Sequence, residues 1–249
     1  MKKIVSLLMA LVCVVLTTVN TNTEVYAKEE NVLNISKSYE VFYRVGECDS
    51  MKGQGPISIT KGELTKNGKT QDVYLVVLYG MVSLDNVVND FDSAQKAIMG
   101  RDNAYLQLVL KLIRENIPQN SNIMLAGGSL GGMVAQQVAS NSDIKKKYNI
   151  VNTITFGSPY INGTKEGTLV RLADKADMVP KLSMSFNFSA VNRNYFIEDG
   201  GYGSDSETAH GWSYARSDVW GEYDVTGFKG GNATLKLYLD TRVYFDAYK

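Results

Sequence analysis

The chain has 249 residues, of which 44% are hydrophobic, and its 26 basic side chains balance 26 acidic ones. This length favours one domain, large enough to bury a core that needs no disulfides. The balanced charge, without a basic stripe, excludes a nucleic-acid-binding protein of the usual basic kind.

The first 27 residues have the pattern of a secretory signal peptide. Two lysines follow the initiating methionine, residues 4–19 form an apolar run, and small residues stand at Val25 and Ala27. The run is short for a membrane-spanning helix. We therefore expect cleavage after Ala27 and a secreted, extracellular domain over residues 28–249.

Of the two cysteines, Cys13 lies in the expected signal peptide, so only Cys48 would remain after cleavage. An intrachain disulfide would then be excluded. Glu47 and Asp49 flank Cys48 and disfavour a thiolate, so this residue is not expected to be a nucleophile.

The first part of the domain predicts a β-hairpin. Residues 39–45 fit either a helix or a strand. Apolar stretches at 57–64 and 73–79 then flank Asn67-Gly68, the strongest short-range hairpin signal. The second stretch is apolar without interruption, as in a strand that is buried on both faces.

Strands and helices alternate in the middle of the chain. Helices are expected over 84–97, 106–117 and 133–140, and strands over 123–126, 149–156 and 169–173. This alternation predicts an α/β fold with a mostly parallel central sheet and helices on both faces. A long irregular stretch follows up to Ala209. Alternating leucines from 235 to 239 then predict a late strand, with Val243 and Phe245 in the same layer.

The glycine-rich stretch 127–132 fits G-x-S-x-G, in which a serine lies on a sharp strand-to-helix turn. Small residues at Gly127 and Gly131 would avoid collisions, and Gly128 would take dihedrals that other residues resist. A tight turn without chemistry is the alternative. A phosphate-binding loop is disfavoured, because Met133 replaces the required lysine and Ser129 replaces a required glycine. We therefore predict that Ser129 is a nucleophile.

A serine nucleophile needs a base, and His210 is the only histidine in the sequence. It follows both Ser129 and a candidate acid, as the order serine, aspartate, histidine requires. Asp177 comes just after the expected strand 169–173 and is a candidate acid, with Asp174 as a nearby rival.

These motifs resemble the class 3 lipases, which are secreted α/β-hydrolases. In that family the G-x-S-x-G motif precedes a strand that ends in T-F-G-x-P and a D-x-V-P motif, here Thr155 to Pro159 and Asp177 to Pro180. The resemblance covers about residues 72–214. It implies a catalytic set of Ser129, Asp177 and His210, with an oxyanion hole formed by the backbone N–H groups of Leu130 and Met81. The chain departs from the family at Met81 and at Gly128, where a histidine is common.

The expected function is that of a secreted serine hydrolase of carboxylic esters, with acylglycerols or other lipids as substrates and with transient contact to a lipid interface. No organic cofactor or metal is expected, and the acidic stretch 199–207 is interpreted as a solvated loop. A phospholipase, acyltransferase or amidase could use the same residues. Another alternative is a silent domain that binds lipid or a surface through the aromatic-rich stretch 186–202.

Overall fold

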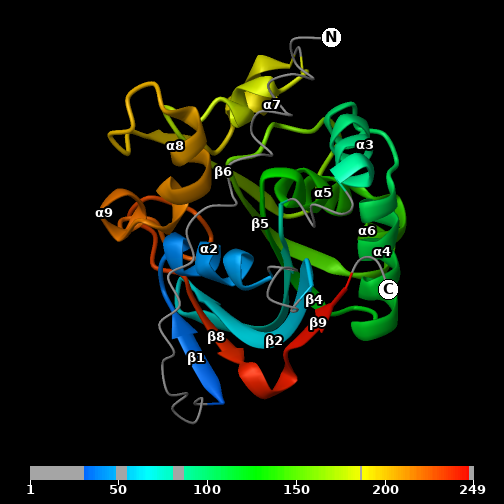
Figure 1. Ribbon diagram of the computed structural model, residues 1–249. Helices are drawn as coiled ribbons and strands as arrows, with labels where there is room; N and C mark the ends of the chain where they lie inside the picture. The colour runs from blue at the N-terminus through cyan, green and yellow to red at the C-terminus, as the bar shows by residue number, and fades with distance from the viewer. Residues whose placement is uncertain (1–30, 49–54, 81–86, 186, 247–249) are drawn as a thin grey trace, which may run out of the picture.

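The structure is a computed structural model that describes residues 31–48, 55–80, 87–185 and 187–246. The expected signal peptide 1–27 and Met81 lie outside these described residues. A nine-stranded sheet runs through the described part (Figure 1) in the order β1-β8-β2-β3-β4-β5-β6-β7, with β9 also paired to β2.

The sheet has a parallel part and an antiparallel part. Strands β3 to β7 are parallel to one another, whereas β2 pairs antiparallel with β3, β8 and β9, and β1 pairs antiparallel with β8. The strand bounds are β1 Val32–Ile35, β2 Ile57–Lys66, β3 Lys69–Leu78, β4 Asn122–Gly128, β5 Asn149–Phe156, β6 Thr168–Asp174, β7 Tyr195–Glu198, β8 Thr234–Tyr238 and β9 Val243–Phe245.

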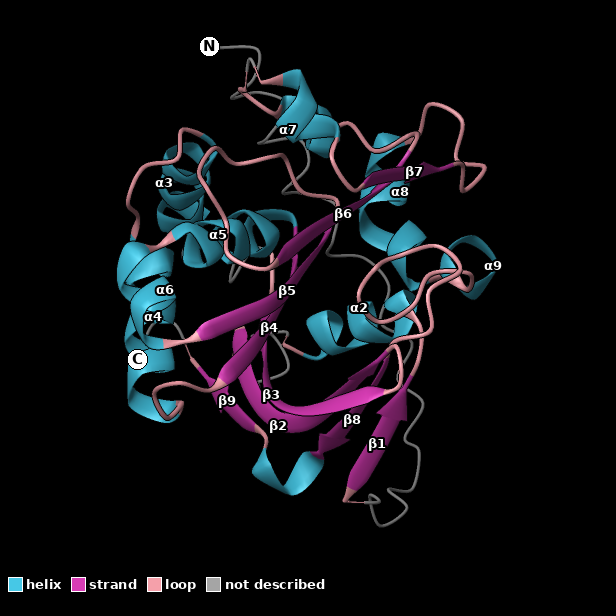
Figure 2. Ribbon diagram, turned by 180° about the vertical axis from the view of Figure 1, so that it is seen from behind, coloured by secondary structure: helices cyan, strands magenta, loops and turns pink. Residues whose placement is uncertain are grey.

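Helices cover both faces of this sheet (Figure 2). Helices α3, α4, α5 and α6 pack on one face, and α2 and α9 pack on the other, with α7 and α8 near the carboxyl ends of the parallel strands. The bounds are α2 Ser38–Glu47, α3 Val87–Ile98, α4 Ala104–Asn116, α5 Ser129–Ser140, α6 Ser142–Lys147, α7 Phe188–Asn192, α8 Ser206–Trp212 and α9 Ser217–Trp220. The predicted α/β fold, with a mostly parallel central sheet between helices, is confirmed.

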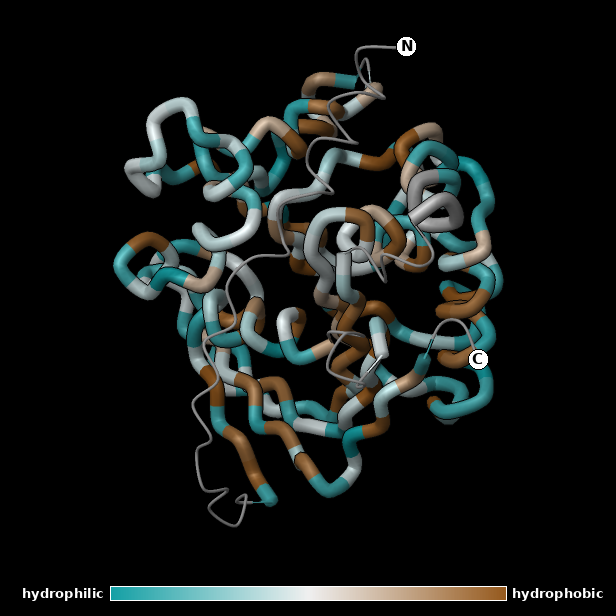
Figure 3. The backbone as a smooth tube through the Cα atoms, in the orientation of Figure 1, coloured by the Kyte–Doolittle hydropathy of each residue, from teal (hydrophilic) through white to brown (hydrophobic). Residues whose placement is uncertain are grey.

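Two apolar layers hold this arrangement together. Val76 and Leu125 face the α4 and α5 side, whereas Val77 and Met124 face the α2 side, because side chains alternate along a strand. Hydrophobic residues accordingly recur along the central strands of the backbone trace (Figure 3). Burial on both faces explains why these strands are continuous apolar runs in the sequence.

The hairpin prediction is also confirmed. Strands β2 and β3 pair from Lys66 and Lys69 outward, and the turn residues Asn67 and Gly68 have φ of 53° and 73°. Residues 39–45, which fitted either element, belong to helix α2.

The late strand is confirmed as β8, and Val243 and Phe245 lie in β9 of the same sheet. The one-turn 3-10 helix Leu239–Thr241 separates β8 from β9, and each pairs with a different part of β2. One sequence expectation needs correction. The stretch after Pro180 is not irregular throughout, since it contains α7, β7 and α8. These elements have four to seven residues, too few for a periodic pattern.

Candidate active site

The strand-to-helix turn at Ser129 has the geometry that its motif predicts. Strand β4 ends at Gly128, helix α5 begins at Ser129, and Ser129 has a φ of 50°. Positive φ is uncommon for a residue with a side chain and is found where the surrounding structure enforces it. The prediction for Gly128 was wrong, since its φ of −104° and ψ of 147° are ordinary extended values. The unusual dihedral belongs to Ser129 itself.

Close backbone contacts explain the glycines on either side of Ser129. A Cβ atom on Gly131 would lie 2.2 Å from the carbonyl oxygen of Leu78, and one on Gly127 would lie 2.6 Å from the carbonyl carbon of Gly131. Any larger residue would therefore push α5 away from the ends of β3 and β4. The Ser158 hydroxyl, from the loop after β5, also donates a hydrogen bond of 2.7 Å to the Ser129 carbonyl oxygen.

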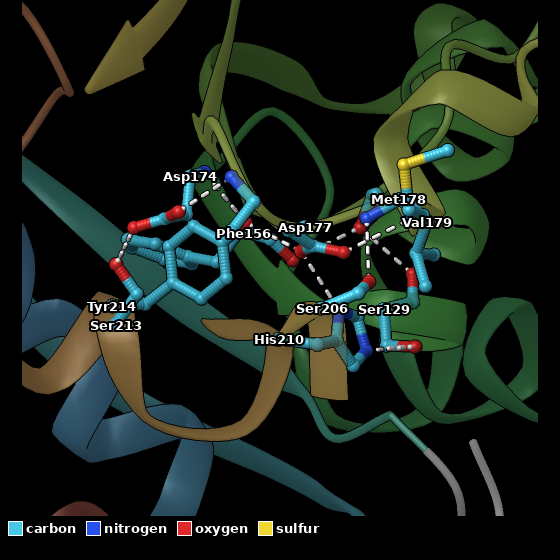
Figure 4. A network of polar contacts seen from close by, with 12 residues as sticks. Ser129, Phe156, Asp174, Asp177, Met178, Val179, Ser206, His210, Ser213 and Tyr214 are labelled. Carbon is cyan, nitrogen blue, oxygen red and sulfur yellow. Dashed lines mark hydrogen bonds and ion pairs between the residues drawn. The ribbon is translucent and has the colours of Figure 1, made fainter. Parts of the chain in front are cut away.

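The structure brings Ser129, His210 and Asp177 into one chain of hydrogen bonds (Figure 4). The Nε2 atom of His210 lies 3.1 Å from the Ser129 Oγ atom, and its Nδ1 atom lies 2.8 Å from the Asp177 Oδ2 atom. The Asp177 side chain is fully buried, while 15% of the His210 side chain is exposed. In this arrangement a buried carboxylate holds the histidine, and the histidine contacts the serine hydroxyl as a base. Such an arrangement activates a hydroxyl group as a nucleophile.

Local hydrogen bonds fix the positions of Asp177 and His210. Asp177 lies in the loop after β6, where its Oδ1 atom accepts a hydrogen bond of 2.8 Å from the Val179 N–H group. His210 lies on α8, whose first turn is capped by the Asp205 side chain. The Met178 N–H group donates to the Ser206 hydroxyl over 2.9 Å, which joins the loop to α8.

Asp174, the rival acid, has other partners. Its buried carboxylate accepts hydrogen bonds from the N–H groups of Ala176 and Gly200 and from the Ser213 hydroxyl, at 2.8, 3.0 and 2.6 Å. These bonds tie the loop after β6 to the segments on either side of α8. The structure therefore places Asp177, rather than Asp174, against His210.

Two residues of this site were not singled out from the sequence. The hydroxyl of the buried Tyr214 donates to Asp177 Oδ2 over 2.7 Å, and no sequence pattern marks that tyrosine. Burial, followed by the nearby charge of Asp177, raises the pKa of Tyr214 well above its usual value. Gly157 has a φ of 60°, and a Cβ atom there would lie 2.8 Å from Asp177 Oδ2. The sequence did contain an indication of this residue, because Gly157 is the glycine of the Thr155 to Pro159 motif.

The region of the expected oxyanion hole is described in part. Leu130 is the second residue of α5, so its N–H group has no partner within the helix ladder. The chain after β3 passes beside the nucleophile, because a Cβ atom on Gly80 would lie 3.1 Å from the Ser129 Cβ atom. Met81, the other expected donor, lies outside the described residues.

Cys48 is buried, and this burial raises the pKa of its thiol to about 12, so it remains a protonated thiol at neutral pH. Within residues 31–48, 55–80, 87–185 and 187–246, no group of three or more His, Cys, Asp or Glu residues could hold a metal ion. None of the helices in these ranges has the length and apolar character to cross a membrane.

The sheet, the serine on its sharp turn and the adjoining histidine and aspartate define a hydrolase-like protein with an α/β-hydrolase fold. The chain belongs to the family of the PGAP1-like alpha/beta domain, which matches residues 66–226. This match supports a lipase-like hydrolase fold but not class 3 lipases specifically, so the resemblance holds only at the coarser level. A comparison with curated proteins found no matching relative.

Proposed function

We propose that this protein is a secreted serine hydrolase that cleaves carboxylic esters, with acylglycerols or other lipids as the substrate class. The observation that carries this proposal is the continuous chain of hydrogen bonds from Ser129 through His210 to Asp177, with distances of 3.1 and 2.8 Å. The extracellular location follows from the sequence pattern of residues 1–27 and is part of the proposal.

In the proposed reaction the Ser129 oxygen attacks the ester carbonyl carbon while its proton passes to His210 Nε2. Asp177 holds the imidazole by its Nδ1–H group and stabilises the imidazolium that forms. The N–H groups of Leu130 and Met81 are the proposed donors to the oxyanion. His210 then gives its proton to the leaving alcohol, and an acyl-enzyme remains on Ser129.

The second half of the reaction repeats these roles with water. His210 takes a proton from a water molecule that attacks the acyl carbonyl carbon. The bond to the Ser129 oxygen then breaks, and His210 returns a proton to that oxygen as the carboxylic acid is released. All proton transfers are made by residues of this chain, so the proposed reaction uses no cofactor.

Two alternatives to an ester hydrolase are considered for this fold. A phospholipase, acyltransferase or amidase would use the same three residues on another scissile bond or acceptor. A catalytically silent domain that binds lipid or a surface would not need the strained Ser129 or a buried acid behind its only histidine. The hydrogen-bonded chain therefore favours hydrolysis over binding alone.

Labelling with a serine-reactive phosphonate tests the proposal. We expect the protein to bind one phosphonate on Ser129, and Ser129→Ala to bind none while it keeps its circular dichroism spectrum. Ser140→Ala is a matched control, because Ser140 ends the same helix and its hydroxyl donates to the Gln136 carbonyl oxygen. Absence of labelling in the folded wild-type protein would contradict the proposal. A panel of esters, phospholipids and amides would then separate the alternatives.

A further inference from the structure

Tyr214 donates a hydrogen bond to the same carboxylate oxygen that holds His210. Asp177 Oδ2 lies 2.8 Å from His210 Nδ1 and 2.7 Å from the Tyr214 hydroxyl oxygen. The Tyr214 oxygen also accepts a hydrogen bond of 3.1 Å from the Asp174 N–H group. The Asp174 N–H group can only donate, whereas the Asp177 carboxylate oxygen accepts. The single phenol proton of Tyr214 therefore points at Asp177.

The surroundings of Tyr214 keep that proton in place. Its ring lies between those of Phe42, Phe156 and Trp220, with centroids 5.6, 6.1 and 5.7 Å away. Burial raises the pKa of the phenol, so it stays protonated over the whole range in which a histidine titrates. The hydroxyl is therefore a permanent donor to Asp177.

The segment that carries Tyr214 is anchored from a second side. The neighbouring Ser213 hydroxyl donates to Asp174 Oδ2 over 2.6 Å. Among the elements packed around Tyr214, the end of β6 and the loop after it present the carboxylates of Asp174 and Asp177, whereas α2 and α9 present Phe42 and Trp220. Asp177 is thus the carboxylate that accepts the hydrogen bond from the Tyr214 hydroxyl.

We propose that Tyr214 is a positioning residue, which fixes the Asp177 carboxylate and sets the basicity of His210 by sharing its acceptor oxygen. A hydroxyl that donates to Oδ2 draws off part of the negative charge that would otherwise stabilise the imidazolium. It also prevents rotation of the carboxylate away from Nδ1. The proposal rests on the function proposed above only for its effect on turnover, because the effect on His210 exists without substrate.

The single histidine makes this effect directly measurable. In an untagged protein, the imidazole signals in a proton NMR titration belong to His210 without any assignment. We expect Tyr214→Phe to raise the pKa of His210 by roughly half to one unit, since one donor to a charged group has been removed. If the protein is a hydrolase, kcat should fall about tenfold with little change in KM, because the loss concerns the base rather than substrate binding.

A matched control and a second variant keep the test decisive. Tyr223→Phe removes another tyrosine hydroxyl that donates to a carboxylate, Glu198 Oε1 at 2.6 Å, and should leave the pKa of His210 unchanged. If Tyr214→Phe does not fold, 3-fluorotyrosine at position 214 keeps the shape but is a stronger donor, and should lower the pKa of His210. An unchanged pKa in a folded variant at position 214 would overturn the proposal. This result is independent of phosphonate labelling, so failure of the proposed function would be distinguishable.

Discussion

Gly157→Ala should damage the site more than the fold. Gly157 directly follows strand β5 and has a φ of 60°, and forcing an ordinary residue into that region costs about 1–2 kcal/mol of stability. The added Cβ atom would also lie 2.8 Å from Asp177 Oδ2 and 3.0 Å from His210 Nδ1, where ordinary contacts begin at 3.4 Å. The aspartate oxygen must therefore move by about 0.6 Å.

That displacement has a predictable kinetic effect. A misplacement of about 1 Å in a catalytic group can cost on the order of 10²-fold in rate. A shift of 0.6 Å between Asp177 and His210 should thus lower kcat by roughly tenfold or more. Hydrolysis of a soluble nitrophenyl ester measures kcat, and urea denaturation measures the free energy of unfolding.

Gly68→Ala is the control for backbone strain. Gly68 has a φ of 73° in the hairpin turn, at the opposite end of β3 from the site, and a Cβ atom there would meet nothing within 4 Å. Both variants should lose about 1–2 kcal/mol of stability, but only Gly157→Ala should lose activity. Equal kcat values in the two folded variants would refute the reasoning, because the contact with Asp177 and His210 would then have no consequence.

Three further predictions follow from the site and the core. His210→Ala and Asp177→Asn should each be severe and should add little to Ser129→Ala, because such residues act as a unit; additive losses in kcat/KM would indicate separate sites. Met81→Ala should keep most of kcat, whereas Met81→Pro, which lacks the backbone donor, should lose about 10²- to 10³-fold if circular dichroism shows it folded. Burial holds the pKa of the Cys48 thiol at about 12 in the folded protein, whereas a cysteine thiol in an unfolded chain has a pKa of about 8.5. Denaturation at several pH values should therefore show the free energy of unfolding falling above about pH 9, with a weaker fall in Cys48→Ala.

The sequence predicted those parts of the fold whose signals are local. The Asn67-Gly68 turn and the unbroken apolar strand after it are set by dihedral preference and by burial on both faces, and both are visible in a short stretch. The strand-to-helix turn was visible in the glycines around Ser129. The dihedral was assigned to Gly128, however, because the pattern does not show which residue takes the positive φ.

The rest of the site depends on contacts between distant segments. Tyr214 meets Asp177 across 37 positions, and no periodicity or motif in the sequence records that contact. The short elements α7, β7 and α8 are likewise held by tertiary contacts rather than by propensity, since helices of five or seven residues are not stable alone. Asp177 was preferred to Asp174 through a family motif, and the structure gives each carboxylate its own set of partners.

The bond between Ser129 and His210 joins residues that are 81 positions apart. The turn that strains Ser129 is built from the contiguous segment β4 and α5, whereas the histidine arrives on α8, much later in the chain. Closing so long a loop carries an entropic cost that only the finished tertiary structure offsets. During synthesis, the segment with Ser129 therefore leaves the ribosome before the segment that carries its base. The hydroxyl gains that base only when the C-terminal segment with His210 and Tyr214 docks.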